Sequence, residues 1–203
     1  MAARDIIVIG ASAGGVEALI QLVGTLPASF RGTLFVVTHV PAHFPSMLPA
    51  ILARSGALSV THALDGGEIR PGHIYVAPPD QHLLLEAGAT RLYHGPKENH
   101  ARPAIDPLFR TAAAEYGPRV VGVVLSGALY DGTAGLITIK RNGGIAIVQD
   151  PEEARYGSMP RSAISRDHPD YILPLSEIAA TLVRLADAEY SEREARRADV
   201  KSA

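Results

Sequence analysis

Short apolar runs recur along the chain, and within each run the apolar residues do not alternate with polar ones. Strands buried on both faces have this Val- and Ile-rich pattern, whereas half-exposed strands alternate. The pattern therefore predicts a parallel sheet that is covered on both sides. The runs are Ile6–Ile9, Leu34–Val37, Ile74–Ala77, Val120–Leu125 and Ile145–Val148.

Segments with a helical spacing of apolar residues lie between these runs. Because strands and helices alternate, we expect an α/β fold: a doubly wound, mostly parallel sheet with helices on both faces. Two polar-flanked runs around Gly88, His82–Leu85 and Arg91–His94, predict a short antiparallel hairpin in addition. The predicted helices are Val16–Leu26, Pro45–Arg54, Pro107–Tyr116 and Thr133–Arg141.

The C-terminal part predicts one more helix and then a tail. Ser176 precedes Ile178 and Leu182 at helical spacing, which predicts an amphipathic helix with Ser176 as its N-cap. The last residues are almost all charged or small. No linker or repeat divides the chain, so we predict one domain over residues 1–187 and a charged tail over residues 188–203.

Composition narrows the class of protein without naming a function. The 203 residues are 47% hydrophobic and 20% charged, which is ordinary for a globular α/β domain of this size. The net charge of −2 indicates neither a nucleic-acid partner nor a membrane surface, and no apolar run approaches the roughly 20 residues of a membrane span. The absence of cysteine excludes thiol chemistry and is compatible with a cytoplasmic location, which we expect.

The chemically most informative segment is Gly10-Ala11-Ser12-Ala13-Gly14-Gly15, between the first strand and the first helix. It fits G-x-S-x-G, in which a sharp strand-to-helix turn presents a serine as a nucleophile. It also resembles the dinucleotide fingerprint G-x-G-x-x-G, but Ser12 replaces the middle glycine, and no acid follows the second strand. A third possibility is that Ser12 only caps the helix.

Three polar residues follow predicted strands and can therefore meet at one edge of the sheet. Ser12 follows the first strand, His39 the second, and Asp131 comes shortly after Val120–Leu125. Parallel sheets bind ligands at the carboxyl ends of their strands. A serine becomes a good nucleophile when an imidazole takes its proton and a carboxylate orients that imidazole, so the three residues predict a Ser-His-Asp triad.

Alternatives remain open for two members of this set. His43 could act as the base in place of His39, although it lies beyond Pro41. The spacing of His39 and His43 would suit a metal only on a helix, which Pro41 disfavours, so we predict no metal site. Asp131-Gly132 is also typical of a turn or helix N-cap.

The irregular polar segment from residue 95 to residue 106 has the composition of a binding loop. Arg102 or His100 in it could contact an acidic region of a substrate. Asp106 at its end is better explained as the start of the next helix.

Taken together, these segments resemble the catalytic domain of the bacterial chemotaxis receptor methylesterases, the CheB family. The resemblance covers roughly residues 5 to 186 in the same order and spacing. Its segments are IGASAGGVEAL, VVTHVPAHFPSMLPAIL, Asp65-Gly66-Gly67, RPGHIYVAPPDQHLLL, HGPKENHARPAIDPLFRTAA, VVGVVLSGALYDGTAGL and SMPRSAI.

The resemblance implies a serine hydrolase without a cofactor. The family's nucleophile, base and acid fall on Ser12, His39 and Asp131, and its substrate would be a glutamyl methyl ester, or a glutamine, on a chemoreceptor or other signalling protein. The backbone N–H of Ala13, and secondly that of Ala128, are our candidates for stabilising the oxyanion. The sequence does not indicate an oligomeric state.

Two departures from the family pattern affect these expectations. The chain begins almost directly at the first catalytic strand, so we expect no receiver domain before it. Gly127-Ala128-Leu129-Tyr130 stands where the family commonly has Gly-Met-Gly before the acid, which changes the rim of the site. A non-catalytic or partner-regulated signalling module with the same fold is therefore the alternative to an esterase.

Overall fold

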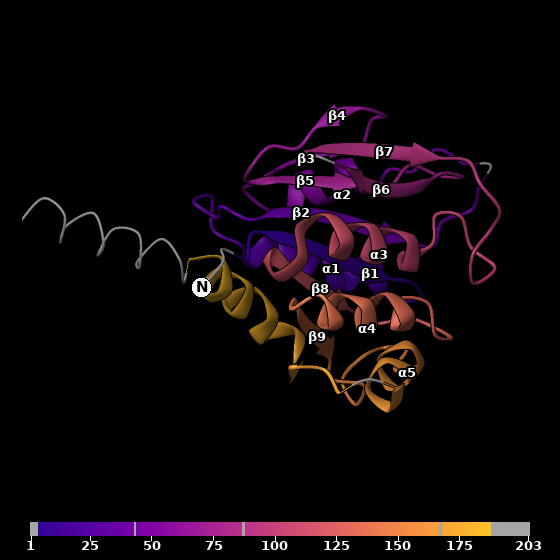
Figure 1. The fold of residues 1–203 in the computed structure, drawn as a ribbon. Coiled ribbons are helices and arrows are strands. Elements are labelled where there is room, and N and C mark those ends of the chain that lie inside the picture. Colours follow the sequence, from indigo (N-terminus) through magenta and orange to yellow (C-terminus); the bar gives the residue numbers. More distant parts are fainter. Residues whose placement is uncertain (1–3, 43, 87, 167, 188–203) are drawn as a thin grey trace, which may run out of the picture.

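A seven-stranded parallel sheet forms the centre of the computed structural model, which describes residues 4–42, 44–86, 88–166 and 168–187 (Figure 1). The strand order is β10-β9-β8-β1-β2-β5-β3, and every neighbouring pair is parallel. The predicted fold class is thereby confirmed. The strands are β1 (Ile6–Ala11), β2 (Thr33–Thr38), β3 (Ser59–His62), β5 (His73–Val76), β8 (Val120–Val124), β9 (Ile145–Gln149) and β10 (Tyr171–Leu173).

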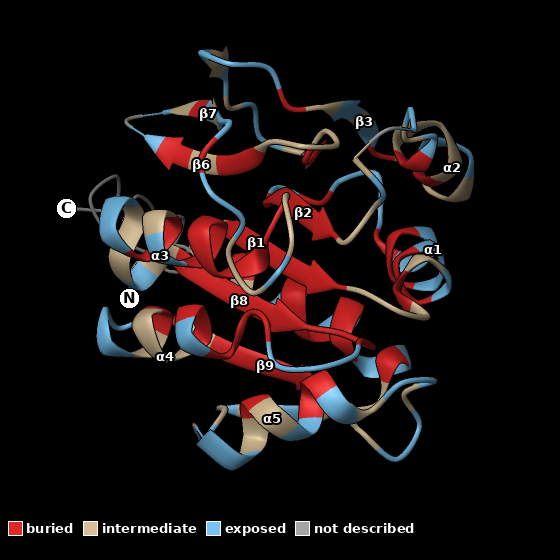
Figure 2. Cartoon of the chain, turned by 90° about the vertical axis from the view of Figure 1, so that its right-hand side faces the viewer, coloured by how far each residue is buried: buried red, intermediate tan, exposed pale blue. Residues whose placement is uncertain are grey.

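Helices cover both faces of this sheet, and their buried sides face it (Figure 2). Helices α1 (Gly15–Thr25) and α2 (Leu48–Ser55) lie on one face together with the last described helix, residues 175–187. The other face carries α3 (Ile105–Tyr116), α4 (Thr133–Arg141) and α5 (Ser158–Arg166). None of the helices in the described part of the chain is both long and apolar enough to cross a bilayer.

A second, smaller sheet packs beside α3. It contains the predicted hairpin, β6 (His82–Glu86) paired antiparallel with β7 (Ala89–Tyr93). A third strand, β4 (Gly67–Glu68), pairs with β7 and was not expected from the sequence, because two residues carry no periodic pattern.

The sequence also missed the two edge strands of the main sheet. In β3 intermediate and exposed residues alternate, and β10 is only three residues long, so neither has the continuous apolar run of a strand buried on both faces. Edge strands are held mainly by backbone hydrogen bonds to the neighbouring strand. These bonds form with any side chains, so the sequence of an edge strand need not have an apolar pattern.

Three predicted helix starts were wrong. Helix α3 begins at Ile105 and not at Pro107. Helix α2 begins at Leu48 and not at Pro45. The last helix begins at residue 175, so Ser176 lies inside its first turn and is not the N-cap. Leu175 is buried in the core cluster around α1, which indicates that apolar packing places the start one residue before the polar signal. The predicted tail, residues 188–203, lies outside the described residues.

Strand β1 marks the point where the strand order reverses. The chain passes from β1 to its neighbour β2 on one side, and later returns through α3 to β8 on the other side of β1. Ligands of open α/β sheets bind at the carboxyl edge beside such a reversal. Ser12, His39 and Asp131 follow these three central strands.

Close packing between α3 and α4 yields a testable prediction about Gly135. A Cβ atom built at Gly135 would lie 2.4 Å from the Cβ of Phe109, which is close to the backbone of α3 and cannot swing away. Gly135→Ala should therefore lower the free energy of unfolding by about 1–3 kcal/mol through overpacking, despite a gain of up to about 1 kcal/mol in helix propensity. Chemical denaturation would measure this change.

The exposed neighbour Ala134 provides the control for helix propensity. Ala134→Gly changes the same helix without a new contact, so it should cost only about 0.5–1 kcal/mol. A Gly135→Ala variant that is more stable than the wild type would show that the two helices can move apart at little cost.

Candidate active site

The turn between β1 and α1 presents the Ser12 side chain at the carboxyl edge of the sheet. Gly14 adopts φ 69°, a left-handed conformation that strains other residues, and a Cβ at Gly15 would lie 2.6 Å from the Cβ of Ala11. The Ser12 N–H donates to Ser126 O at 3.0 Å, which ties the turn to the segment after β8. The N-cap of α1 is Gly14, without a side-chain cap, so Ser12 does not cap the helix.

His39 lies between Ser12 and Asp131 and contacts both. Its Nδ1 is 3.0 Å from Ser12 Oγ, and its Nε2 is 2.8 Å from Asp131 Oδ2. Because a carboxylate accepts only, Nε2–H donates to Asp131, which leaves Nδ1 to accept the Ser12 hydroxyl proton. The imidazole is held in the tautomer of a general base, with 24% of its side chain exposed.

Asp131 is buried, with 2% exposure, and is surrounded by hydrogen-bond donors. Oδ2 accepts from the Ile105 N–H at 2.7 Å in addition to His39. Oδ1 accepts from Asn99 Nδ2 at 2.7 Å and from the N–H groups of Asp106 and Gly132 at 3.2 Å and 2.9 Å. Burial would raise the pKa of Asp131, but the hydrogen bonds from His39, the Ile105 N–H and Asn99 outweigh it and lower the pKa.

Asp131 is therefore not a simple cap of α4. The N-cap of α4 is Gly132, which makes no side-chain cap, and the Asp131 carboxylate instead faces the first N–H groups of α3. The positive end of a helix dipole favours a carboxylate at this position. The charge of Asp131 is stabilised on one side by backbone amides and on the other by His39.

Asn99, which contacts Asp131, was not among the site residues predicted from the sequence, although it belongs to the polar segment predicted to be a binding loop. Asp106 lies in the first turn of α3, one residue after the helix begins at Ile105, so it is at the start of this helix as expected. Burial raises the pKa of Asp106, the Gly135 N–H opposes this rise, and the nearby charge of Asp131 adds to it. The sequence did contain one usable signal, because Asn tolerates a left-handed backbone better than most residues and so often occupies tight turns. In the structure Asn99 has φ 50°.

The two proposed oxyanion donors lie beside Ser12. Within the described ranges, the N–H groups of Ala13 and Ala128 have no hydrogen-bond acceptor, whereas the amides of Gly127 and Leu129 are bonded to Tyr156 O and Ser158 Oγ. A Cβ at Gly127 would lie 3.0 Å from Ser12 Cβ, so this turn packs directly against the serine. Both N–H groups are therefore available to a ligand, as an oxyanion hole requires.

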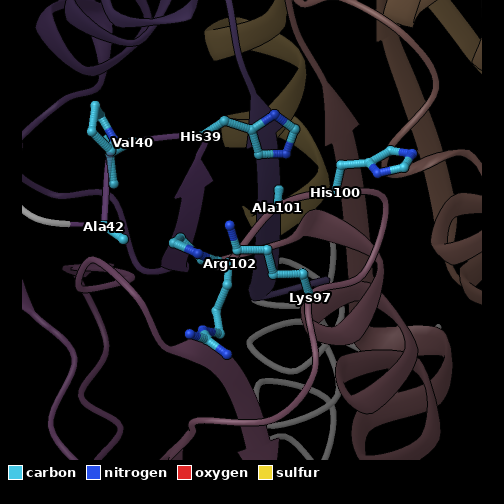
Figure 3. Close-up of a pocket in the computed structure, with 9 residues that line it drawn as sticks. His39, Val40, Ala42, Lys97, His100, Ala101 and Arg102 are labelled. Carbon is cyan, nitrogen blue, oxygen red and sulfur yellow. The ribbon is translucent and has the colours of Figure 1, made fainter.

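Two adjoining cavities meet at His39. One, of about 230 Å³, is lined by Ser12, His39 and Asp131. Leu129 also lines it and is 61% exposed. The other, of about 330 Å³, extends away along Val40 and Lys97 (Figure 3). The two share His39, His100 and Ala101.

Arg102 lines the larger cavity, but its guanidinium is engaged within the protein. Nε and Nη2 donate to Asp80 Oδ1 at 2.8 Å and 2.6 Å, and Nη1 donates to Gly95 O. Figure 3 shows the guanidinium at the far end of the side chain from the His39 ring. A substrate contact of Arg102 stays a prediction, and the structure favours a role in holding the loop.

The two remaining candidate residues are both histidines. His100 is exposed and lines both cavities, so it can reach a ligand beside His39. His43, the alternative base, lies outside the described residues. Within the described ranges no three His, Asp or Glu side chains gather in a way that could hold a metal ion.

Comparisons with known proteins identify the family of this chain. The family model described as CheB methylesterase matches residues 7–182. A relative from Leptospira interrogans is 41% identical over 190 residues, covering 93% of this chain and 98% of that protein.

Other relatives are longer than this chain. The protein-glutamate methylesterase/protein-glutamine glutaminase of Thermotoga maritima is 36% identical, and the match covers 89% of this chain but 54% of that protein. The crystal structure of the Thermotoga maritima CheB methylesterase catalytic domain superposes with a TM-score of 0.86 at 37% identity, over 89% of this chain and 98% of that one. This chain belongs to the CheB methylesterase family.

Proposed function

We propose that this protein is a serine hydrolase that removes methyl groups from glutamyl methyl esters of a signalling protein. The observation that carries the proposal is the continuous chain of contacts from Ser12 through His39 to Asp131, at the edge of the sheet where β1, β2 and β8 end. Family membership supports the ester as substrate, because relatives are named protein-glutamate methylesterases.

In the proposed mechanism, His39 Nδ1 takes the Ser12 proton while Ser12 Oγ attacks the ester carbonyl. The N–H groups of Ala13 and Ala128 stabilise the oxyanion. The intermediate collapses, His39 returns the proton to the methoxide oxygen, and methanol leaves an acyl-Ser12 ester. A water molecule activated by His39 then releases the glutamate and restores Ser12. Asp131 keeps the imidazole oriented and stabilises its charged form.

We further propose that the substrate lies on the cytoplasmic region of a methylated chemoreceptor, which would require the enzyme to work in the cytoplasm. A primary amide can follow the same acyl chemistry with ammonia as the leaving group, and the relatives are also named glutaminases. Specific glutamines of the same receptor are therefore a second group of substrates.

Methanol release and covalent labelling test this proposal together. The purified protein should release methanol from a methylated receptor fragment, and a serine-directed phosphonate should form an adduct at Ser12 that mass spectrometry of peptides locates. In His39→Gln the phosphonate should label Ser12 at least about a thousand-fold more slowly, since the general base is removed. Ammonia release from the unmethylated fragment would report deamidation.

The alternative function, a signalling module without catalysis, makes the opposite prediction. Ser12 would then react no faster than the exposed Ser165, and no methanol would be released. The contact between Ser12 and His39 favours the enzyme, because a serine hydroxyl within hydrogen-bond reach of an imidazole that a carboxylate orients is the arrangement that nucleophilic catalysis requires.

A further inference from the structure

One side-chain amide joins the two buried carboxylates of this region. Asn99 Nδ2 is 2.7 Å from Asp131 Oδ1 and 2.8 Å from Asp106 Oδ2. An amide nitrogen carries two hydrogens, so each carboxylate receives one of them. This arrangement uses the whole donor capacity of Nδ2 and fixes how the amide is turned.

The second carboxylate, Asp106, is itself held firmly. Its Oδ1 accepts from the Gly135 N–H at 2.7 Å, and the residue lies in the first turn of α3 with 5% exposure. Both Asp106 oxygens therefore face N–H donors, which suits an ionised carboxylate, and Asp106 connects Asn99 to the first turns of α3 and α4. Two titratable or charged side chains face this pair: His39 at Asp131, and Arg110 near Asp106. Arg110 is itself paired with Glu98.

The backbone around Asn99 supports the same position. Glu98 and Ala101 exchange backbone hydrogen bonds at 3.2 Å and 2.8 Å, closing a tight loop in which Asn99 and His100 both have positive φ. Asn and Asp tolerate this conformation better than other residues with a side chain. The loop thus presents the amide at a defined place beside Asp131.

We propose that Asn99 is a positioning residue for the hydrolysis described above, and that Asp106 acts through it. The Asn99 amide holds Asp131 Oδ1, so that Oδ2 stays directed at His39 Nε2. Asp106 holds the other hydrogen of the amide, which prevents Asn99 from turning its oxygen toward Asp131. The inference rests on the proposed function for its rate readout, but the orientation of His39 can be observed without any substrate.

Two substitutions separate the amide from the backbone. Asn99→Gly keeps the positive φ and removes the side chain, while Asn99→Asp keeps shape and backbone preference but cannot donate. Both should lower kcat by roughly 10- to 100-fold, because Asp131 loses a charge-assisted hydrogen bond, with KM changed by less than about threefold. Asn99→Asp should be the more severe, since it adds a third carboxylate.

The pH profile gives a second readout that a merely structural role would not move. In Asn99→Gly the Asp131 carboxylate loses a hydrogen bond to its ionised form and becomes the more basic partner of the His39 Nε2–H. The acid limb of kcat/KM, which reports the hydrogen-bonded His39–Asp131 pair as a unit, should therefore move to higher pH. Asp106→Asn removes a nearby negative charge, so the limb should move to lower pH. In the Asn99→Gly background, Asp106→Asn should lower kcat little further.

Glu98→Gln is the matched control, because it changes the same loop through the half-exposed ion pair with Arg110 and does not contact Asp131. Its kcat should stay within about twofold of the wild type, as expected for loss of an exposed ion pair. If both Asn99 variants had the kcat of the wild type and the same acid limb of kcat/KM, the positioning role would be refuted, whereas the proposed hydrolase function would not be affected. A raised KM with unchanged kcat would also overturn it, and would make Asn99, which lines the smaller cavity, a substrate contact.

Proton NMR of the free protein tests the positioning role without a substrate, and therefore also if the protein cleaves no methyl ester. The His39 Nε2–H that faces Asp131 should give a downfield signal in the wild type and in Glu98→Gln. The signal should weaken or move upfield in Asn99→Gly and Asn99→Asp. An inactive wild type with this pattern would refute the proposed function only, whereas an unchanged signal in both Asn99 variants would refute the positioning role.

Discussion

Ser12→Ala should abolish methanol release, with kcat/KM falling by roughly ten-thousand-fold or more. In hydrolases of this type the oxyanion donors and substrate binding alone leave only a small residual rate when the nucleophile is removed. The Ser12 hydroxyl contacts His39, whereas the backbone N–H and O of Ser12 bond to Ser126 and Gly15 and are unchanged by the substitution. The melting temperature should therefore change by less than about 2 °C.

Methanol release over time, with circular dichroism for the fold, would measure this result. Ser165→Ala is the control, because Ser165 is exposed on α5, far along the chain from the site, and its hydroxyl donates to the Ser162 carbonyl. Hydrolysis at the wild-type rate in Ser12→Ala would contradict the assignment of the nucleophile.

Asp131→Asn should combine a large loss of activity with a loss of stability. Asp131 accepts five hydrogen bonds and donates none, so an asparagine must turn its NH₂ group either toward His39 or toward the N–H donors around Oδ1. The first choice holds His39 in the wrong tautomer, and we expect kcat to fall by roughly a thousand- to ten-thousand-fold. Either choice leaves buried donors unpaired, the Ile105 N–H in the first and the donors around Oδ1 in the second, at a cost of about 1–3 kcal/mol.

The stability difference between wild type and Asp131→Asn should depend on pH in a defined direction. The folded-state pKa of Asp131 lies below the ordinary aspartate value of 3.8, so ionisation stabilises the fold at neutral pH. That contribution is present above the ordinary value and is lost as the pH falls through the lowered one. The two proteins should therefore differ most in denaturation midpoint near neutrality and converge in acid.

Asp150→Asn serves as the control for this experiment. Asp150 follows β9, and its carboxylate accepts from the Glu152 N–H in an exposed turn. It should leave the rate unchanged and cost only a few tenths of a kcal/mol. An Asp131→Asn variant with wild-type kcat would indicate that His39 is oriented by other groups.

The alternation of apolar runs and helical segments predicted the sheet, its buried central strands and the hairpin correctly. These elements could be identified because their residues carry the period of the structure they form: β1, β2 and β8 are buried throughout, and α3 has a regular apolar stripe. The same pattern placed Ser12, His39 and Asp131 after central strands of one sheet. Elements that lack a period of their own, such as β4 and β10, could not be found this way.

The amino-acid sequence determined the class of fold and the types of residue at its active edge, because these depend on local periodicity and on residues that directly follow strands. Tertiary structure alone decided which polar groups meet. Asn99 and Asp106 join Asp131 only when α3 packs beside α4, and Arg102 turns to Asp80 because the loop folds back. Such contacts join residues distant along the chain, and burial, which sets their strength, is a property of the packed molecule.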